Sequence, residues 1–194
     1  MHPRPRWPAL TASLVLAGLA LAACSPALDW RTFSWPQGGF SVLLPGKPVE
    51  DTREVDVGAL KLTLHLFSVR VEEGIWAAGY ADLPPGLALA GREQLLVDAE
   101  NAYRRNVGAA MPAADAAAHA ASNTVSSTAS DATGLLCRNV EARGQAARHD
   151  LVLSARLCAS TARYYPLISI GPAVASSGTA TSDIASFLAS LRVE

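Results

Sequence analysis

Hydrophobic and polar residues alternate along much of the chain from Trp30 onward, and a period of two predicts β-strands. The clearest run is 60–66, where four leucines alternate with Lys61, Thr63 and His65. After Phe67 the apolar positions change parity, which indicates either a bulge or burial on both faces. Other strands are expected at 30–35, 40–44, 50–57, 75–83, 135–141, 151–158 and 163–170.

Two segments change to the helical period. In 92–107, an apolar stripe predicts an amphipathic helix that covers a sheet; it consists of Leu95 or Leu96, Ala99, Tyr103 and Val107. A closing helix is expected from about Ser182, the predicted N-cap, with Ile184, Phe187, Leu188 and Leu191 on one face. The Ala/Ser/Thr-rich stretch 109–133 has little to bury, so we interpret it as a mobile connection. This order of elements predicts an α+β fold, a mainly antiparallel sheet covered by helices.

Pro166 interrupts the last predicted strand. Proline has no N–H to donate to a ladder, so we expect 163–170 to be an edge strand or to be irregular at this position.

The first 23 residues have the organisation of a signal peptide. Arg4 and Arg6 form a positive n-region, 9–20 is apolar, and the segment ends in Leu21-Ala22-Ala23-Cys24. The last four residues resemble the lipobox of bacterial lipoproteins, which implies lipidation of Cys24 and a mature chain of 24–194. An ordinary secretory signal or a buried N-terminal helix is the alternative. By analogy with that family, Ser25 favours sorting to the outer membrane, with the protein facing the periplasm.

Composition beyond the signal predicts one domain, 30–194, joined to Cys24 by a tether, 24–29, whose last five residues reach roughly 17 Å when extended. Loss of Arg4 and Arg6 moves the formal net charge from -1 to -3, and only two lysines are present. A mildly acidic chain with scattered arginines has no electrostatic footprint for nucleic acid. The lipid is therefore the expected attachment to a membrane.

Two cysteines remain once Cys24 is assigned to lipid. Cys137 and Cys158 lie on neighbouring predicted strands, joined by a turn expected at 143–146, and alternation places both on the more polar face of the hairpin. In the register that brings them opposite each other they form a disulfide, and Glu141 lies near Ser154. Two free thiols, or a slipped register that separates them, remain the alternatives.

Several segments together resemble the PsbP-like α/β/α sandwich proteins. These segments are 30–33, 39–48, 80–84, Tyr164-Tyr165 and 186–191. The resemblance implies a sheet with helices on its faces. It also implies a non-catalytic role, because characterised members mostly bind or stabilise other proteins.

Residues for catalysis or metal binding do not form a motif. The three histidines after the signal, His65, His119 and His149, are not spaced as metal ligands, and no nucleophile elbow or phosphate loop is present. Arg104-Arg105 could bind an anion, but cations near a helix end also suit the helix dipole, and we favour the second interpretation. The aromatic residues Trp30, Trp35, Trp76 and Tyr80 are expected in the core. We expect no enzyme activity, metal or cofactor.

Two functions follow as expectations. The first is a lipid-anchored envelope protein that binds or stabilises a protein partner, which requires an exposed apolar patch. The second is a small-ligand carrier or sensor, which requires an apolar pocket between sheet and helix with a few inward polar groups.

Overall fold

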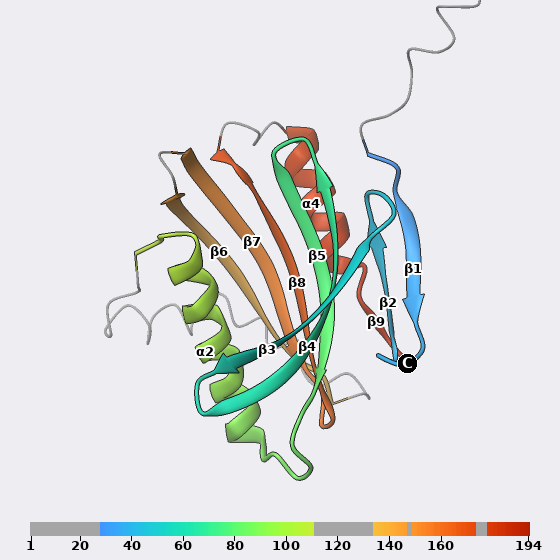
Figure 1. The fold of residues 1–194 in the computed structure, drawn as a ribbon, viewed down its shortest axis with the longest axis vertical. Helices are drawn as coiled ribbons and strands as arrows, with labels where there is room; N and C mark the ends of the chain where they lie inside the picture. Colours follow the sequence, from blue (N-terminus) through green and yellow to red (C-terminus); the bar gives the residue numbers. More distant parts are fainter. Residues whose placement is uncertain (1–27, 111–133, 147–148, 174–177) are drawn as a thin grey trace, which may run out of the picture.

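The chain forms two antiparallel sheets and two helices (Figure 1), and the computed structural model describes residues 28–110, 134–146, 149–173 and 178–194. The six-stranded sheet has the order β3-β4-β5-β8-β7-β6, and a small sheet has the order β1-β2-β9. The strands are β1 (Arg31–Trp35), β2 (Phe40–Leu44), β3 (Val49–Val57), β4 (Leu60–Val71), β5 (Gly74–Asp82), β6 (Leu136–Ala146), β7 (His149–Ala159), β8 (Arg163–Pro172) and β9 (Arg192–Val193). The helices are α2 (Leu89–Asn106) and α4 (Gly178–Ala189). The predicted α+β class, mainly antiparallel, is confirmed.

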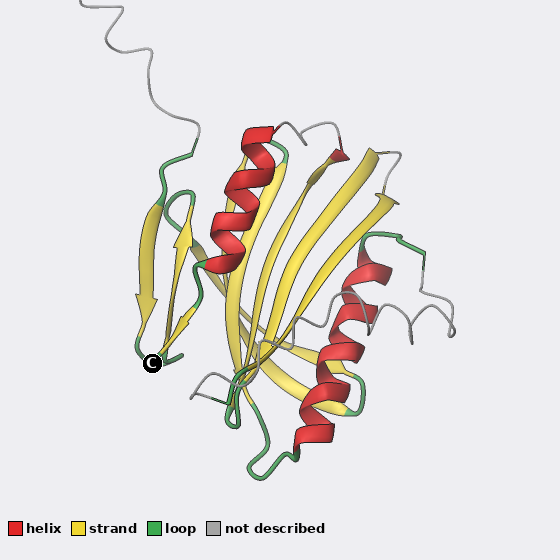
Figure 2. Ribbon diagram, turned by 180° about the vertical axis from the view of Figure 1, so that it is seen from behind, coloured by secondary structure: helices red, strands yellow, loops and turns green. Residues whose placement is uncertain are grey.

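The two faces of the six-stranded sheet bury separate cores. Helix α2 covers one face through Leu95, Leu96 and Ala99, which pack on leucines and alanines of the sheet. The small sheet and α4 lie side by side over the other face (Figure 2), where Phe40 and Phe187 are fully buried. The fold is therefore layered, with one helix on each side of the large sheet.

Strand β4 contributes to both cores, which explains the change of parity at Phe67. Its first half turns Leu62 and Leu64 toward α2, and its second half turns Phe67 and Val69 toward the small sheet. Its pairing with β3 and β5 runs without a shift in register. Burial on both faces is thus confirmed, and there is no bulge in this strand.

Aromatic side chains fill the core between the two sheets. Phe40 has no exposed surface, and ring centroids of Trp35, Tyr165, Tyr80 and Phe67 lie 5.1, 5.7, 6.0 and 6.3 Å from its own. Offset and tilted aromatic pairs at such distances add to the stability gained from burial alone. Tyr80 and Trp76 belong to the buried core, as expected, whereas Trp30 and Trp35 are partly buried and pack against it.

The six-stranded sheet consists of two three-stranded meanders, β3-β4-β5 and β6-β7-β8, joined by pairing of β5 with β8. Pro166 lies at this junction, so the prediction of an edge strand is wrong. The β5–β8 ladder pairs Ala78 with Leu167 and Ala81 with Tyr164, and no pair is formed between these positions. The proline is tolerated because its missing N–H falls in this interruption, which agrees with the expected irregularity.

The predicted turn and N-cap differ from the structure, and one strand was not predicted. The turn expected at 143–146 is part of β6, which continues to Ala146, and the residues between β6 and β7, 147–148, lie outside the described residues. Ser182 lies inside α4, which begins at Gly178, and its carbonyl accepts a hydrogen bond from Ser186. The two-residue strand β9, which pairs with Phe40 and Ser41, was not predicted.

A buried carboxylate fixes α2 to the edge of the large sheet. Glu100 is 7% exposed, and its carboxylate accepts hydrogen bonds from Arg104, one turn later on α2, and from Arg138 of β6. One carboxylate between two guanidinium groups is the arrangement that a buried acid needs to remain charged. This contact positions the C-terminal half of α2, where the cleft described next is formed.

Candidate functional site

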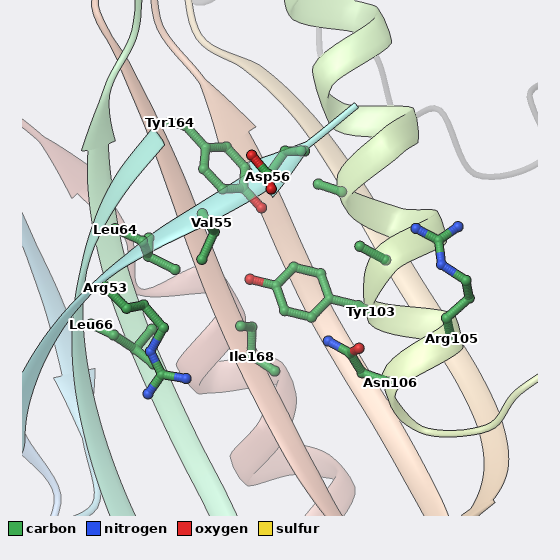
Figure 3. Close-up of a pocket in the computed structure, with 13 residues that line it drawn as sticks. Arg53, Val55, Asp56, Leu64, Leu66, Tyr103, Arg105, Asn106, Tyr164 and Ile168 are labelled. Carbon is green, nitrogen blue, oxygen red and sulfur yellow. The ribbon is translucent and has the colours of Figure 1, made fainter. Parts of the chain in front are cut away.

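A cleft of about 450 Å³ lies between α2 and the sheet (Figure 3). Its walls come from β3 and β4 on one side, α2 on the other and β8 at its base. The lining residues are Arg53, Val55, Asp56, Val57, Leu64, Leu66, Ala99, Ala102, Tyr103, Arg105, Asn106, Tyr164 and Ile168. The volume lies in the range of small-molecule sites, and the lining is mainly apolar with a few polar groups, as in such sites generally.

The β3–β4 hairpin forms one wall because its tip folds onto α2. Gly58 occupies the turn with a φ of 60°, and a side chain there would collide with the carboxylate of Asp98 on α2. Glycine is needed at this position both for the left-handed backbone and for the close approach. The hairpin thus closes one end of the cleft and brings Val55 and Asp56 opposite α2.

Two tyrosine hydroxyls belong to the cleft. Tyr164 is 2% exposed, and its hydroxyl makes no hydrogen bond of normal geometry with any described residue. Tyr103 extends from α2 into the same space (Figure 3). A buried hydroxyl without a partner is rare, because it costs the free energy of its lost hydration.

Burial controls the ionisation of both tyrosines. It raises the pKa of Tyr103 to about 12, against a smaller lowering by the Tyr164 hydroxyl and by the charge of Arg53. Burial also raises the pKa of Tyr164 well above its usual value, and Tyr103 adds to that shift. Both groups therefore stay protonated at neutral pH, and each can donate a hydrogen bond to an acceptor oxygen.

Charged groups surround the mouth of the cleft. Arg53 forms an ion pair with Asp51, and Asp56 lies 2.9 Å from the ammonium group of Lys61. Arg105 is exposed, and its guanidinium group makes no ion pair or hydrogen bond with any residue in the described part of the chain. The carboxylate of the lining is thus already neutralised, whereas one of its two cations is available to a ligand.

The Arg104-Arg105 pair divides between two roles. Arg104 is held by Glu100 and is largely buried, so it is a structural residue. Arg105, the next residue, lines the cleft. Both arginines lie near the end of α2, where the sequence analysis interpreted them as cations that suit the helix dipole. Arg105 can in addition bind a ligand in the cleft.

The histidines do not form a site. His65 is half-buried on the face opposite the cleft, with its ring stacked on Tyr80 at 4.7 Å and its Nδ1 3.1 Å from the Thr52 hydroxyl. His149 is exposed at the start of β7, and His119 lies outside the described residues. Within the described ranges, no three His, Cys, Asp or Glu side chains converge as a metal ion requires.

Cys137 and Cys158 are directly opposite each other in the β6–β7 ladder, with Cα atoms 4.1 Å and sulfur atoms 2.13 Å apart. The same register pairs Glu141 with Ser154, as expected. The two cysteines were expected on the more polar face of the hairpin. That expectation is wrong, because Cys158 is fully buried in the aromatic core. Cys24, the predicted lipidation site, lies outside the described residues, as does all of the segment 1–23.

The surface described by the structure offers little apolar area for a partner. Among the described residues, the large hydrophobic side chains that are exposed are Val49 and Leu89, at 70% and 53%. Neither α2 nor α4 has the length and apolar character needed to cross a membrane. The cleft is therefore a candidate site in the described part of the chain.

Comparison with known proteins identifies no relative, since neither a protein-family model nor a curated protein sequence matches the chain. The function must be argued from the cleft itself. Sequence analysis placed Tyr103 on the buried stripe of a helix but did not bring it together with Tyr164. The sequence did contain one indication of this pairing. Tyr103 and Tyr164 are phenols at positions that are otherwise apolar, and a buried tyrosine usually needs a partner for its hydroxyl.

Proposed function

We propose that this protein binds a small, largely apolar molecule in the cleft between α2 and the six-stranded sheet. The observation that carries this proposal is the Tyr164 hydroxyl, which is 2% exposed in a cleft of about 450 Å³, has only the Tyr103 hydroxyl beside it and makes no hydrogen bond of normal geometry with a described residue. A ligand that accepts a hydrogen bond from this hydroxyl removes the cost of leaving it unpaired. Leu64, Leu66 and Ile168 provide the apolar contacts for the rest of the molecule.

The same observations favour ligand binding over the protein-partner function expected from the sequence. That function requires an apolar surface of several hundred Å², and the exposed large hydrophobic residues of the described chain are Val49 and Leu89. A cleft with inward hydroxyls is instead what a carrier or sensor of small molecules requires.

Filling the cleft tests the proposal. Ala102 lines it, so an Ala102→Trp variant places an indole in the space where the ligand would bind. We expect the neutral fluorescent probe N-phenyl-1-naphthylamine to bind the wild-type full chain, and the variant to lose affinity for it by about tenfold or more, the effect of blocking an apolar site. The measurement is a fluorescence titration.

Ala90→Trp is the matched control, because Ala90 is exposed near the start of the same helix and does not line the cleft. It should bind the probe as the wild type does. Circular dichroism must show both variants folded. Equal probe affinity of a folded Ala102→Trp variant and the wild type would contradict binding in the cleft.

We also propose that the fold is PsbP-like and that Cys24 carries lipid. Helices on opposite faces of one antiparallel sheet support the first point, and an experimental structure with both helices on one face would remove it. The Leu21-Ala22-Ala23-Cys24 sequence supports the second. In this proposal the lipid holds the ligand-binding domain close to a membrane, the outer membrane on its periplasmic side.

Lipidation predicts a labelling result in bacterial cells that produce the full chain. With an alkyne analogue of palmitate, the wild type should be labelled and should sediment with membranes, because several acyl chains give durable attachment. Cys24→Ser should abolish the label and release the protein, whereas Cys137→Ala should retain both. A labelled Cys24→Ser variant would contradict the assignment.

A further inference from the structure

We propose that the ligand of the cleft is a monocarboxylate with an apolar body, its carboxylate directed to the tyrosine hydroxyls; this inference rests on the function proposed above and names the class of ligand. Two features of the lining distinguish a carboxylate from a neutral or cationic ligand: the kind of hydrogen-bonding group that the cleft offers and the sign of the charges around it.

The two tyrosine hydroxyls inside the cleft can both donate a hydrogen bond. The hydroxyls of Tyr103 and Tyr164 both belong to the lining, and that of Tyr164 has no partner of normal geometry in the described chain. A carboxylate accepts several hydrogen bonds and donates none, so one carboxylate can accept from both phenols. Bonds from a neutral donor to a charged acceptor are also shorter and stronger than bonds between neutral groups.

The charges around the cleft favour an anion. Arg53, which is paired with Asp51, and Arg105 are the cations of the lining, and its carboxylate, Asp56, is paired with Lys61. The charge of Arg53 acts on the Tyr103 hydroxyl itself, where it opposes the effect of burial on the tyrosine pKa. Arg105 makes no ion pair with a residue in the described part of the chain. An incoming carboxylate can therefore pair with the guanidinium group of Arg105, whereas the carboxylate that an ammonium group would need, Asp56, is already paired with Lys61.

The remaining wall defines the other end of the ligand. The side chains of Val55, Leu64, Leu66 and Ile168 offer only hydrocarbon, from β3 and β4 on one side of the cleft and β8 at its base. With a cleft of about 450 Å³, this surface accommodates a medium-length acyl chain. A single charge suffices, because a second carboxylate on the apolar body would be buried without a partner.

Displacement of the neutral probe by two molecules with the same chain tests the class of ligand. We expect decanoate to displace N-phenyl-1-naphthylamine at concentrations about tenfold or more below those needed for decan-1-ol, the discrimination typical of charge-assisted hydrogen bonds. Tyr164→Phe should weaken decanoate by a similar factor and leave decan-1-ol within about twofold. Arg105→Gln should weaken decanoate by a few-fold, and less at high salt, because the guanidinium group is exposed.

Two matched variants control for indirect effects. Tyr80→Phe removes a phenol hydroxyl from the opposite core, and Arg70→Gln removes an exposed guanidinium group outside the cleft. Both should bind decanoate as the wild type does. Equal displacement by decanoate and decan-1-ol, with probe binding still sensitive to Ala102→Trp, would overturn the carboxylate but leave the ligand-binding cleft. If the Ala102→Trp variant binds the probe with the same affinity as the wild type, the proposed function is overturned as well.

Discussion

Replacing Phe40 with alanine will lower the free energy of unfolding by about 3–5 kcal/mol, the range observed when a fully buried phenylalanine is truncated. Phe40 has no exposed surface, and it contacts aromatic rings from the small sheet and from β4, β5 and β8. Truncation therefore removes a contact that joins the two sheets, and the rigid rings around it cannot collapse into the space. Urea denaturation followed by tryptophan fluorescence measures the effect.

Phe33→Ala is the matched control for Phe40→Ala. Phe33 lies on β1, paired with Val42 of β2, and it is only half-buried at the edge of the same core. Its truncation should cost less than half as much, because much of its surface is already in contact with water. Equal losses for the two variants would show that the small sheet is not held by Phe40.

Removing the Cys137–Cys158 disulfide will cost about 3 kcal/mol, according to the loop-entropy model for cysteines 21 positions apart in the chain. The double variant Cys137→Ala/Cys158→Ala is preferable to serine, since Cys158 is fully buried and a hydroxyl there would need a partner. The wild type in reductant should lose a similar free energy of unfolding. Both losses are measured by urea denaturation.

Reductant provides the control for the disulfide. It should have no effect on the stability of the double variant, because Cys137 and Cys158 are absent from it. Thiol titration of the native protein adds a direct test. If Cys137 and Cys158 both react as free thiols before unfolding, or if the double variant is as stable as the wild type, the bond does not form.

Local patterning was sufficient to predict most strands and the covering face of α2. The Phe40–Leu44 strand matches its predicted limits, and Leu95, Leu96 and Ala99 form the buried stripe of α2. Pairing between distant segments was beyond local patterning. Pro166 is tolerated in a central strand only because its missing N–H falls where β8 and β5 are not paired, a fact of tertiary structure. The strand Arg192–Val193 is too short to carry a period.

The candidate site was less predictable than the fold because it depends on three contacts between distant segments. The β3–β4 hairpin must fold onto α2 at Gly58 and Asp98, Glu100 must hold α2 through Arg138, and Tyr164 must face the same side of the sheet as Tyr103. The sequence placed each residue on an element but could not place the elements together. The described histidines and cysteines, whose chemistry attracts attention in a sequence, lie away from the cleft: His65, His149, Cys137 and Cys158.

The division of the large sheet into two meanders has a consequence for how the chain folds. Within β3-β4-β5 and within β6-β7-β8, each strand pairs with its neighbour in sequence, so these contacts close short loops and form quickly. Pairing of β5 with β8 joins segments far apart in the chain, and it has one interruption at Pro166. We therefore expect the joining of the two halves to be the slow step of folding, and the cleft, whose walls come from both, to form only with that step.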